Sequence, residues 1–534
     1  MVALGRCGAG VARLRHGLVR SRALSAMPLL RRLEAHGAQD GVVSANGELL
    51  THGELLECAS GVDASLRARL GLPGGLGGAR VGVLCAPGGE FVSSMLGVWR
   101  AGGCLVPLCV SHPHAELKYV VEDCGVSAVV ADAAHWAAAA ALSRPVLSPG
   151  EAAAAGRVRP AAASVEPGHA AKLIYTSGTT GRPKGVVTRH SALEAQMADQ
   201  RAAWGWVGED RALNVLPLHH VHGLVNMTLV PLSAGACVEF CDAKPARLWQ
   251  RFRLAGAGQP VSVFSAVPTI YARLVAEYDP MAPRAQAKSA QALRGLRLMM
   301  SGSAALPSAL SERWLALSGH RLLERLGQTE TGMTLSNPLE PPEARHVGCV
   351  GTPLPSVQVR LVDAASETEI DPLSGEPGEL RFKGPGVFSE YWGKPELTAK
   401  EFDAQGWFKS GDVACYDTQR SSFRVLGRAS ADIIKSAGYK LSALEIEAEL
   451  LNHPGVAELA VLGVPDAQFG EKVACILLPK SGASAFDLDN FKLWAAERLA
   501  KYKLPTIYRL LQEEIPKNAM GKVAKKQLRE LYFS

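Results

Sequence analysis

One stretch of the chain gathers four aliphatic hydroxyls, three glycines and a lysine within eleven residues, Tyr175-Thr-Ser-Gly-Thr-Thr-Gly-Arg-Pro-Lys-Gly185. Glycines let backbone N–H groups turn toward an anion, hydroxyls add further donors, and a lysine adds positive charge. This composition predicts a phosphate-binding loop. It is not a Walker A loop, because Lys184 is followed by Gly185 instead of Ser or Thr.

The alternative for this stretch is a plain Gly/Ser/Thr surface turn. An apolar run, Ala171-Lys-Leu-Ile-Tyr175, precedes the loop and predicts a short buried strand. A surface turn after a buried strand requires neither four hydroxyls nor a lysine. The phosphate-loop interpretation is therefore favoured.

Three further apolar runs, each predicted to be a strand, lead into small or polar residues. They are Val261–Phe264, Leu296–Met300 and Arg321–Arg325, and the last two open into Ser301-Gly-Ser303 and Leu326-Gly-Gln-Thr-Glu330. Ligands of open parallel sheets bind beyond the carboxyl ends of the strands. The pattern therefore predicts a ligand crevice at these strand ends.

Three histidines in four positions, His219, His220 and His222, raise the question of a metal site. No cysteine or acidic residue lies close to them in sequence, and structural metal sites usually combine several such ligands. We therefore expect these histidines to pack or to line a pocket rather than to hold a metal ion.

The surrounding segments alternate between strand and helix patterns from about residue 40 to 170. Val81–Cys85 and Ala128–Ala131 predict buried parallel strands, and Glu90–Arg100 predicts an amphipathic helix between them. From about residue 347 the pattern changes to short alternating strands such as Val357–Val362 and Gly378–Phe382. These patterns predict a large α/β domain of layered parallel sheets with a small β-rich subdomain.

The final hundred or so residues predict a separate α+β domain. Helix 443–451 follows Ser442, with Glu445 placed for a capping box. Strands near 457–462 and 473–478 and a helix at 490–499 follow. The last loop, Ile515-Pro-Lys-Asn-Ala-Met-Gly-Lys522, carries an isolated lysine before a charged helix.

Composition excludes several classes of protein. A length of 534 residues with 47% hydrophobic and 20% charged residues is typical of a globular enzyme with more than one domain. No apolar run approaches the ~18 residues that span a bilayer, so we expect no stable membrane insertion. The 11 cysteines are scattered, which argues against a zinc ribbon or a disulfide framework and favours reduced thiols.

The first 33 residues contain seven arginines and no acidic residue. This composition predicts an organellar transit peptide over residues 1–30, addressed to the mitochondrial matrix, with a plastid as an open alternative and the cytosol if the leader is absent. A disordered basic tail is the other interpretation. Five of the arginines precede Met27, so most of the net charge of +6 belongs to this leader. The charge therefore gives no reason to expect nucleic-acid binding.

Five motifs, taken in order, resemble those of the acyl-activating, adenylate-forming enzyme superfamily. They are the loop at 175–185, Gly327-Gln-Thr-Glu330, Ser410-Gly-Asp412, Gly427-Arg428 and Pro516-Lys-Asn-Ala-Met-Gly-Lys522. The resemblance implies an N-terminal adenylation domain over residues 31–428 and a mobile C-terminal domain over 429–534. It also implies a two-step reaction in which ATP activates a carboxylate as an acyl-adenylate and coenzyme A then displaces AMP.

The resemblance also implies roles for individual residues. Lys522, Thr176 and Glu330 would be catalytic, and Glu330 would hold Mg²⁺. Lys522 would bridge the substrate carboxylate and the α-phosphate. Without the resemblance, Asp412 and Lys522 are ordinary loop charges. The nucleotide would be bound by Thr176, Ser177, Gly178, Thr179, Thr180, Gly181, Arg182, Pro183, Lys184, Thr329, Asp412, Arg428 and Lys522.

The C-terminal domain of such enzymes swings about a hinge, which is Ser430 here by resemblance. The swing would bring Lys435, Gly438 and Tyr439 to the coenzyme A path. Two positions depart from the family pattern. Leu326 stands where a tyrosine usually stacks on adenine, and Gln328 stands where methionine is common.

Within the superfamily, the motifs are most similar to those of malonyl-CoA synthetases. The shared stretches are His219-His-Val-His-Gly223, Val267-Pro-Thr-Ile-Tyr271, Ser301-Gly-Ser-Ala-Ala-Leu-Pro307 and Leu323-Glu-Arg-Leu-Gly327. By this resemblance Arg273, Ser303 and Arg325 would contact the free carboxylate of malonate, and His220 would line the same pocket.

Three alternatives remain open. The substrate could be methylmalonate or another short- or medium-chain acid. The chain could be an adenylation module that loads a carrier protein, although no carrier domain follows residue 522. A binding role without catalysis is the third. For Arg325 the alternative to substrate binding is an ion pair with Glu324 or Glu330.

Overall fold

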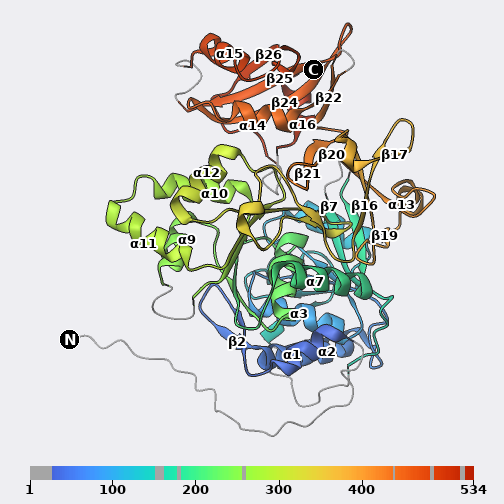
Figure 1. The fold of residues 1–534 in the computed structure, drawn as a ribbon. Helices are drawn as coiled ribbons and strands as arrows, with labels where there is room; N and C mark the ends of the chain where they lie inside the picture. Colours follow the sequence, from blue (N-terminus) through green and yellow to red (C-terminus); the bar gives the residue numbers. More distant parts are fainter. Residues whose placement is uncertain are drawn as a thin grey trace.

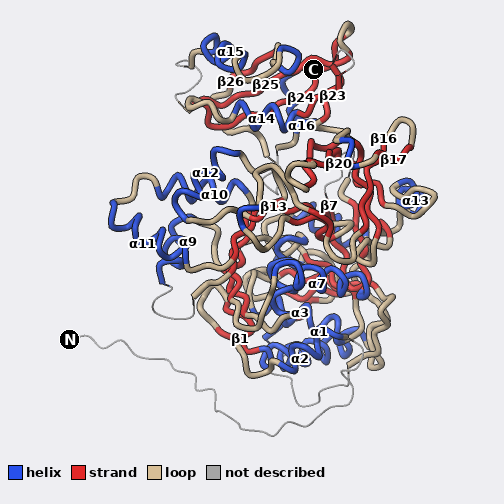
Figure 2. The backbone as a smooth tube through the Cα atoms, viewed as in Figure 1, coloured by secondary structure: helices blue, strands red, loops and turns tan. Residues whose placement is uncertain are grey.

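The computed structural model describes residues 27–150, 162–176, 182–254, 260–436, 439–480, 486–517 and 523–533. Figure 1 shows a large body that contains three sheets and, above it, a smaller lobe formed by the residues that follow β21. The helices and strands of the two parts are distinguished in Figure 2.

The largest sheet has nine strands, and its central strands are parallel. Its edge strands β15, β14 and β2 are antiparallel to their neighbours. In spatial order the strands are β15 (Thr352–Pro353), β14 (Gly332–Ser336), β13 (Leu323–Gln328), β12 (Leu298–Gly302), β11 (Val263–Ala266), β9 (Arg211–Asn214), β10 (Cys237–Phe240), β1 (Asp40–Val43) and β2 (Leu49–Thr51).

The second sheet has seven strands and is parallel from β7 to β6. Two antiparallel strands, β8 and β19, close its other edge. In spatial order the strands are β19 (Glu390–Tyr391), β8 (Lys184–Arg189), β7 (Ala170–Thr176), β4 (Cys104–Pro107), β3 (Arg80–Leu84), β5 (Ala128–Ala131) and β6 (Val146–Leu147). Val, Ile, Leu and Ala fill these strands, as expected for a parallel sheet that is covered on both faces.

The third sheet is antiparallel throughout and forms the β-rich subdomain. In spatial order its strands are β17 (Thr368–Ile370), β16 (Gln358–Asp363), β18 (Gly378–Lys383), β20 (Phe408–Asp417) and β21 (Ser422–Arg428). Ser410-Gly-Asp412 lies within β20. β20 is a long internal strand of this sheet.

Helices cover the two parallel sheets, and α7 packs against strands of both. The helices of the large body are α1 (Pro28–Ala35), α2 (His52–Leu70), α3 (Gly89–Arg100), α4 (His114–Asp123), α5 (Trp136–Ala140), α7 (His190–Trp204), the π-helix η1 (His222–Leu229), α8 (Val230–Ser233), α9 (Pro245–Arg253), α10 (Pro268–Tyr278), α11 (Pro283–Arg294), α12 (Ser308–Ser318), α13 (Pro395–Lys400) and the short 3₁₀ helices η3 (Pro342–Ala344) and η4 (Pro372–Ser374).

The helix predicted at 90–100 is present as α3, but it is not amphipathic in its setting. It packs against α2 and against strands β3 and β4, so nearly every residue is buried, including Ser93 and Ser94. The two serine hydroxyls donate to the carbonyl of Glu90 and so stay satisfied inside the core.

The smaller lobe has the predicted α+β composition. Its sheet contains β22 (Ile433–Ser436), β23 (Tyr439–Ser442), β24 (Val456–Asp466), β25 (Gly470–Pro479) and β26 (Ile507–Leu510). Its helices are α14 (Ala443–Leu450), α15 (Leu488–Ala496), η6 (Lys501–Lys503) and α16 (Lys525–Phe533). Ser442 caps α14 by accepting from the Glu445 N–H at 3.0 Å. The Glu445 carboxylate pairs with Lys503 at 3.0 Å, where the sequence predicted the reciprocal contact of a capping box.

The expected leader boundary at residue 30 falls inside α1. Met27, Leu29 and Leu30 are buried in the main core, and Arg32 pairs with Glu194. Residues 27–30 therefore belong to the core of the large body. Within the described ranges, no helix has the length and apolar character that a bilayer crossing requires, and the ten described cysteines are free thiols.

Candidate active site

The predicted phosphate loop connects two strands of the seven-stranded sheet. β7 and β8 form an antiparallel hairpin in which Thr176 pairs with Lys184, so both predicted ligands stand at the base of the loop. The hydroxyl of Tyr119 donates to the Pro183 carbonyl at 2.8 Å, and the guanidinium of Arg182 lies 5.6 Å from the Tyr119 ring. Ser177, Gly178, Thr179, Thr180 and Gly181 lie outside the described residues.

Lys184 faces a cluster of groups drawn from distant parts of the chain. Its ammonium lies 4.2 Å from the centre of the Tyr391 ring and 3.8 Å from the Glu401 carboxylate. The Tyr391 hydroxyl donates to Glu330 Oε1 at 2.8 Å. Burial raises the pKa of Glu401, and the Lys184 charge partly offsets this rise. The cluster places a cation and two carboxylates beside the phosphate loop.

The Glu330 carboxylate suits a hard cation. Tyr391 engages one of its oxygens, and no described residue forms a hydrogen bond to the second. Carboxylate oxygens are preferred ligands of Mg²⁺, which also takes ligands from phosphates and water. Glu330 lies in the turn between β13 and β14, next to Thr329, and is half-buried.

Asp412 is held in the middle of β20 by contacts with the neighbouring strand β21 and with Gln328. Its partner in the neighbouring strand is Arg428, whose Nε lies 2.7 Å from Asp412 Oδ1. Gln328 Nε2 donates to the other carboxylate oxygen at 2.5 Å, and the Asp412 N–H donates to the Ser410 hydroxyl at 3.0 Å. Only 5% of Asp412 is exposed, so its orientation is fixed.

Gln328 is one of the two residues that depart from the family pattern, and the structure gives it a positioning role. Besides Asp412, its amide donates to the Ser410 carbonyl at 3.1 Å. The same carbonyl accepts from Arg428 Nη1 at 2.8 Å. Gln328 therefore links the end of β13 to β20, the strand that carries Asp412. The sequence identified this position as unusual but did not indicate its partner.

Arg325 lies in β13 and is buried, with 4% of its surface exposed. Its Nη2 donates to His222 Nε2 and lies 3.4 Å from the Ser265 hydroxyl. His222 in turn contacts Ser265 Oγ at 2.8 Å and Ser303 Oγ at 3.3 Å. Ser265 lies at the carboxyl end of β11, Ser303 directly follows β12, and Arg325 lies in the middle of β13. The three strands pair in parallel as predicted.

These contacts define the tautomer of His222. Arginine only donates hydrogen bonds, so His222 Nε2 must accept from Arg325 and the proton resides on Nδ1. Nδ1–H then donates to Ser303 Oγ. Ser303 adopts a left-handed backbone with φ of 67°. A non-glycine residue in this region carries a strain of order 1–3 kcal/mol, and such residues cluster at functional sites.

No acidic side chain pairs with Arg325 among the described residues, and its buried Nε has no hydrogen-bond partner there. The two acids that sequence proximity suggested are engaged elsewhere. Glu324 accepts from the Gly348 N–H at 2.9 Å, and Glu330 accepts from Tyr391. Burial lowers the pKa of Arg325 to about 10, so the guanidinium is still charged at neutral pH. The protein thus buries the positively charged Arg325 guanidinium without an acidic partner among the described residues, an arrangement that favours binding of an anion.

His222 begins the π-helix η1, and its position depends on Asn214. The Asn214 amide donates to the carbonyls of Gly223 and Met227 at 3.1 and 3.3 Å. A β-carbon on Gly223 would lie 2.3 Å from the Pro217 carbonyl oxygen, so only glycine fits there. π-Helical turns are rare and concentrate at functional sites. Sequence reasoning chose His220 from this segment, whereas His222 makes the central contacts.

The remaining predicted site residues are more dispersed. Arg273 is exposed on α10, with no hydrogen bond or ion pair to another described residue. The His220 ring lies 4.0 Å from that of His219 and is half-buried. Lys435 and Tyr439 are exposed on the β22–β23 hairpin, where Tyr439 stacks on Tyr502. Gly438 and Lys522 lie outside the described residues.

Leu326 packs into the core of the β-rich subdomain, opposite Leu335 of β14. The Leu326 side chain therefore packs against the β-rich subdomain. The sequence patterns did not single out four residues that make contacts in this site, namely Tyr391, Glu401, Ser265 and His222. Only His222 carried a local signal, since it belongs to the histidine cluster.

Comparison with protein families matches two segments of the chain. Residues 31–392 match the family described as AMP-binding enzyme, and residues 445–522 match the AMP-binding enzyme C-terminal domain. The first segment contains Glu330, Tyr391 and the whole Arg325 environment. The second contains the position of Lys522.

Curated relatives cover most of the chain. A malonate–CoA ligase of Arabidopsis thaliana is 42% identical over 487 residues, which cover 86% of this chain and 78% of the relative. The mitochondrial malonate–CoA ligase ACSF3 of Homo sapiens is 39% identical over 532 residues, which cover 94% of this chain and 91% of the relative. Among solved structures, ATP-bound MatB from Rhodopseudomonas palustris superposes with a TM-score of 0.83 at 33% identity, covering 95% of this chain and 98% of MatB.

Proposed function

We propose that this chain, which belongs to the AMP-binding enzyme family, is an ATP-dependent ligase that joins malonate to coenzyme A. The products are malonyl-CoA, AMP and diphosphate. The family match and the two malonate–CoA ligase relatives support the reaction type. The observation that carries the choice of substrate is the buried charge of Arg325, which has no acidic partner among the described residues.

The reaction has two balanced steps. In the first, an oxygen of one malonate carboxylate attacks the α-phosphorus of ATP, the bond to the bridging oxygen breaks, and diphosphate leaves. In the second, the sulfur of coenzyme A attacks the acyl carbon, its proton is lost, and AMP leaves. Neither step requires a nucleophile from the protein. The enzyme must hold and orient charged groups, and positioned charges of this kind act strongly in a site that excludes water.

Arg325 binds the carboxylate of malonate that does not react. Its planar guanidinium can form two parallel hydrogen bonds to a carboxylate, and His222 and Ser265 hold it in place. Ser303 adds a hydroxyl at the neighbouring strand end, and His220 and Arg273 line the approach. An acid with an alkyl chain would leave the buried guanidinium unpaired, which is costly. Methylmalonate keeps the second carboxylate, so we expect it to be a further substrate.

The nucleotide lies along the hairpin loop and the middle of β20. Thr176 to Lys184, with Thr329, bind the phosphates, and Asp412 accepts hydrogen bonds from the ribose hydroxyls with Arg428 beside it. Lys522 approaches the α-phosphate from the smaller lobe, beyond a hinge at Ser430. After the lobe turns, Lys435, Gly438 and Tyr439 line the path of coenzyme A. The domains are then residues 27–428 and 429–534.

Glu330 would hold Mg²⁺ with the oxygen that Tyr391 leaves available. When bound, the ion would neutralise charge on the phosphates of ATP. Lys184 performs the same electrostatic task from the hairpin, and the Tyr391 hydroxyl holds the Glu330 carboxylate in place.

Diphosphate release across a panel of acids tests this function. We expect malonate to be the preferred substrate, methylmalonate to follow, and propionate, butyrate and octanoate to react weakly. Free coenzyme A should accept the acyl group, which distinguishes a ligase from a module that loads a carrier protein. A preference for a monocarboxylate would contradict the role of Arg325.

We also propose that residues 1–26 form a leader for the mitochondrial matrix, as the name of the human relative suggests. A fluorescent fusion of the full chain should then enter mitochondria, and a fusion that lacks these residues should stay in the cytosol. The shortened enzyme should remain active in vitro, because it keeps Met27, Leu29 and Leu30, which pack in the core.

A further inference from the structure

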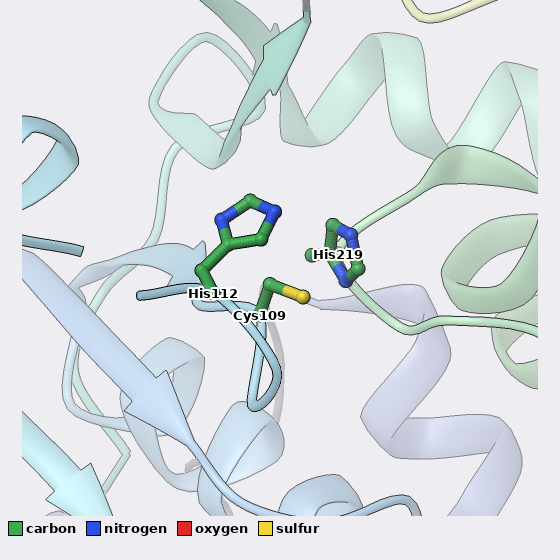
Figure 3. A group of neighbouring side chains, drawn as sticks. All are labelled: Cys109, His112 and His219. Atoms are coloured by element: carbon green, nitrogen blue, oxygen red, sulfur yellow. The ribbon is translucent and has the colours of Figure 1, made fainter. Parts of the chain in front are cut away.

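A cysteine and two histidines from different sheets meet outside the site described above. Cys109 and His112 follow β4 of the seven-stranded sheet, and His219 follows β9 of the nine-stranded sheet. One potential ligand atom from each residue lies within 4.8 Å of the other two. Figure 3 shows the Cys109 sulfur between the two loops, with one ring nitrogen of His112 directed toward His219.

We propose that Cys109, His112 and His219 form a binding site for Zn²⁺. A thiolate and two imidazoles are a ligand set that zinc prefers, and three protein ligands leave a fourth position for water. In a tetrahedral zinc site, the ligand atoms stand about 3.3–3.8 Å apart. The three side chains therefore need to close by at most about 1–1.5 Å to bind the ion.

Neighbouring groups support this assignment. His112 Nδ1 lies 3.3 Å from the Glu116 carboxylate, so the other ring nitrogen is the one that can bind a metal. A carboxylate behind a ligating imidazole is a common outer contact in zinc sites, where it orients the ring. The Ser111 hydroxyl lies 3.2 Å from the Cys109 sulfur.

The surroundings of the Cys109 sulfur also favour the thiolate, which is the form that binds metals. Burial alone raises the pKa of the Cys109 thiol, but hydrogen bonds with His112, His219 and Ser111 outweigh burial and lower that pKa to about 5. A thiolate, rather than a thiol, is the metal ligand. The geometry of the three side chains stands independently of this shift.

A zinc ion at this position would join two loops that belong to separate sheets. His219 adjoins His220, with ring centres 4.0 Å apart, and precedes His222 by three positions. The ion would therefore restrain the segment 215–223, from which His222 reaches Arg325. This inference does not depend on which acid the enzyme activates.

Metal binding to the full-length chain tests the proposal. We expect calorimetry to give one Zn²⁺ per chain with a Kd below about 1 µM. Co²⁺ should give a thiolate charge-transfer band that Zn²⁺ abolishes. Cys109→Ser should remove the band and weaken Zn²⁺ binding at least 100-fold, and His219→Gln should weaken binding similarly. Glu116→Gln should weaken binding about 10-fold, the lower range for outer contacts.

The matched control is Cys241→Ser, since Cys241 is a partly buried thiol that directly follows strand β10. It should bind both metals as the parent does. Zn²⁺ should also slow hydrogen exchange in both loops, 108–113 and 215–223, and protect Cys109 from iodoacetamide. The proposal is overturned if Cys109→Ser binds as tightly as the parent, or if exchange slows in one loop only. It is also overturned if saturating Zn²⁺ leaves Cys109 open to alkylation.

Discussion

Gly302 and Arg325 are paired in adjacent parallel strands, and the missing side chain of Gly302 provides the space that the Arg325 guanidinium occupies. A β-carbon on Gly302 would lie 2.0 Å from Arg325 Nη1. Glycine at this position is therefore required by a neighbouring side chain, without any need for an unusual backbone conformation. The proposed malonate pocket depends on both residues.

Arg325→Leu should lower kcat/KM for malonate by about 30-fold to several thousand-fold. Truncating one member of a buried charge pair costs ~2–5 kcal/mol, and 1.4 kcal/mol corresponds to a factor of ten. The same change should leave kcat/KM for butyrate unchanged or improved, because butyrate leaves the parent arginine unpaired. Initial rates of diphosphate release with both acids measure the effect. Equal losses would mean that Arg325 supports the fold or the nucleotide.

Gly302→Ala should move the Arg325 guanidinium without removing its charge. We expect kcat/KM for malonate to fall on the order of 10-fold, since the guanidinium loses its fixed position relative to His222. The KM for ATP should change little. Gly168→Ala is the control, because a β-carbon there meets no atom within 4 Å. A Gly302→Ala enzyme with the parent's malonate kinetics would show that the pocket tolerates a displaced arginine.

Substitutions of Gln328 should raise the KM for ATP, and the increase should be larger the more strongly the new side chain disturbs Asp412. Gln328→Met removes a hydrogen bond to a charged group, worth about 1.5–3 kcal/mol, and should raise the KM for ATP by about 10-fold. Gln328→Glu places a second carboxylate beside Asp412 and should raise that KM further. ATP titrations at saturating malonate and coenzyme A measure both. A glutamate variant that binds ATP as the parent does would contradict the contact.

Lys522→Ala should abolish adenylate formation and spare thioester formation. A single positioned acid or cation contributes about 10²–10⁴ in rate, and the proposed role of Lys522 is confined to the first step. Diphosphate exchange measures the first step, and coenzyme A consumption from preformed malonyl-AMP measures the second. Lys517→Ala is the control, since Lys517 lies in the same loop but pairs with Glu458 at 2.7 Å. Equal loss of both steps would contradict the two-conformation mechanism.

Glu324 should make the stability of the large body decrease as the pH rises. Burial raises the pKa of Glu324 from 4.5 to about 8, so between these values the folded state retains a proton that the unfolded chain has lost. Stability then falls with rising pH across this window. Glu324→Gln keeps an acceptor for the Gly348 N–H and removes the titration.

The Tm advantage of Glu324→Gln over the parent should therefore be larger at pH 8 than at pH 5, by on the order of 2 °C. Differential scanning calorimetry at the two pH values, at one scan rate, measures it. Glu312→Gln, an exposed change on α12, should show no such difference. An advantage of Glu324→Gln that is the same at both pH values would mean that Glu324 is ionised in the folded enzyme.

Local sequence patterns determined the architecture of this protein and the type of its chemistry. Runs of apolar residues identified β3, β5 and β7, because a buried parallel strand needs apolar side chains on both faces. The composition of 175–185 predicted a phosphate loop, because glycine, hydroxyl and lysine groups act together over a few neighbouring residues. The predicted ends of the strands were less accurate, because β11, β12 and β13 end two or three residues later than predicted. Their polar residues pair within the sheet, which an apolar pattern does not reveal.

Only the tertiary structure decided which side chains meet. Glu324 precedes Arg325 in the chain, yet successive side chains of a strand point to opposite faces, so the two cannot pair. Arg325 instead contacts His222, about a hundred positions earlier. Gln328 of the nine-stranded sheet donates to Asp412 of the antiparallel sheet. Cys109 and His112, which are distant in sequence, lie next to His219 of the histidine cluster. Such contacts depend on how sheets pack, and no short segment of the sequence contains that information.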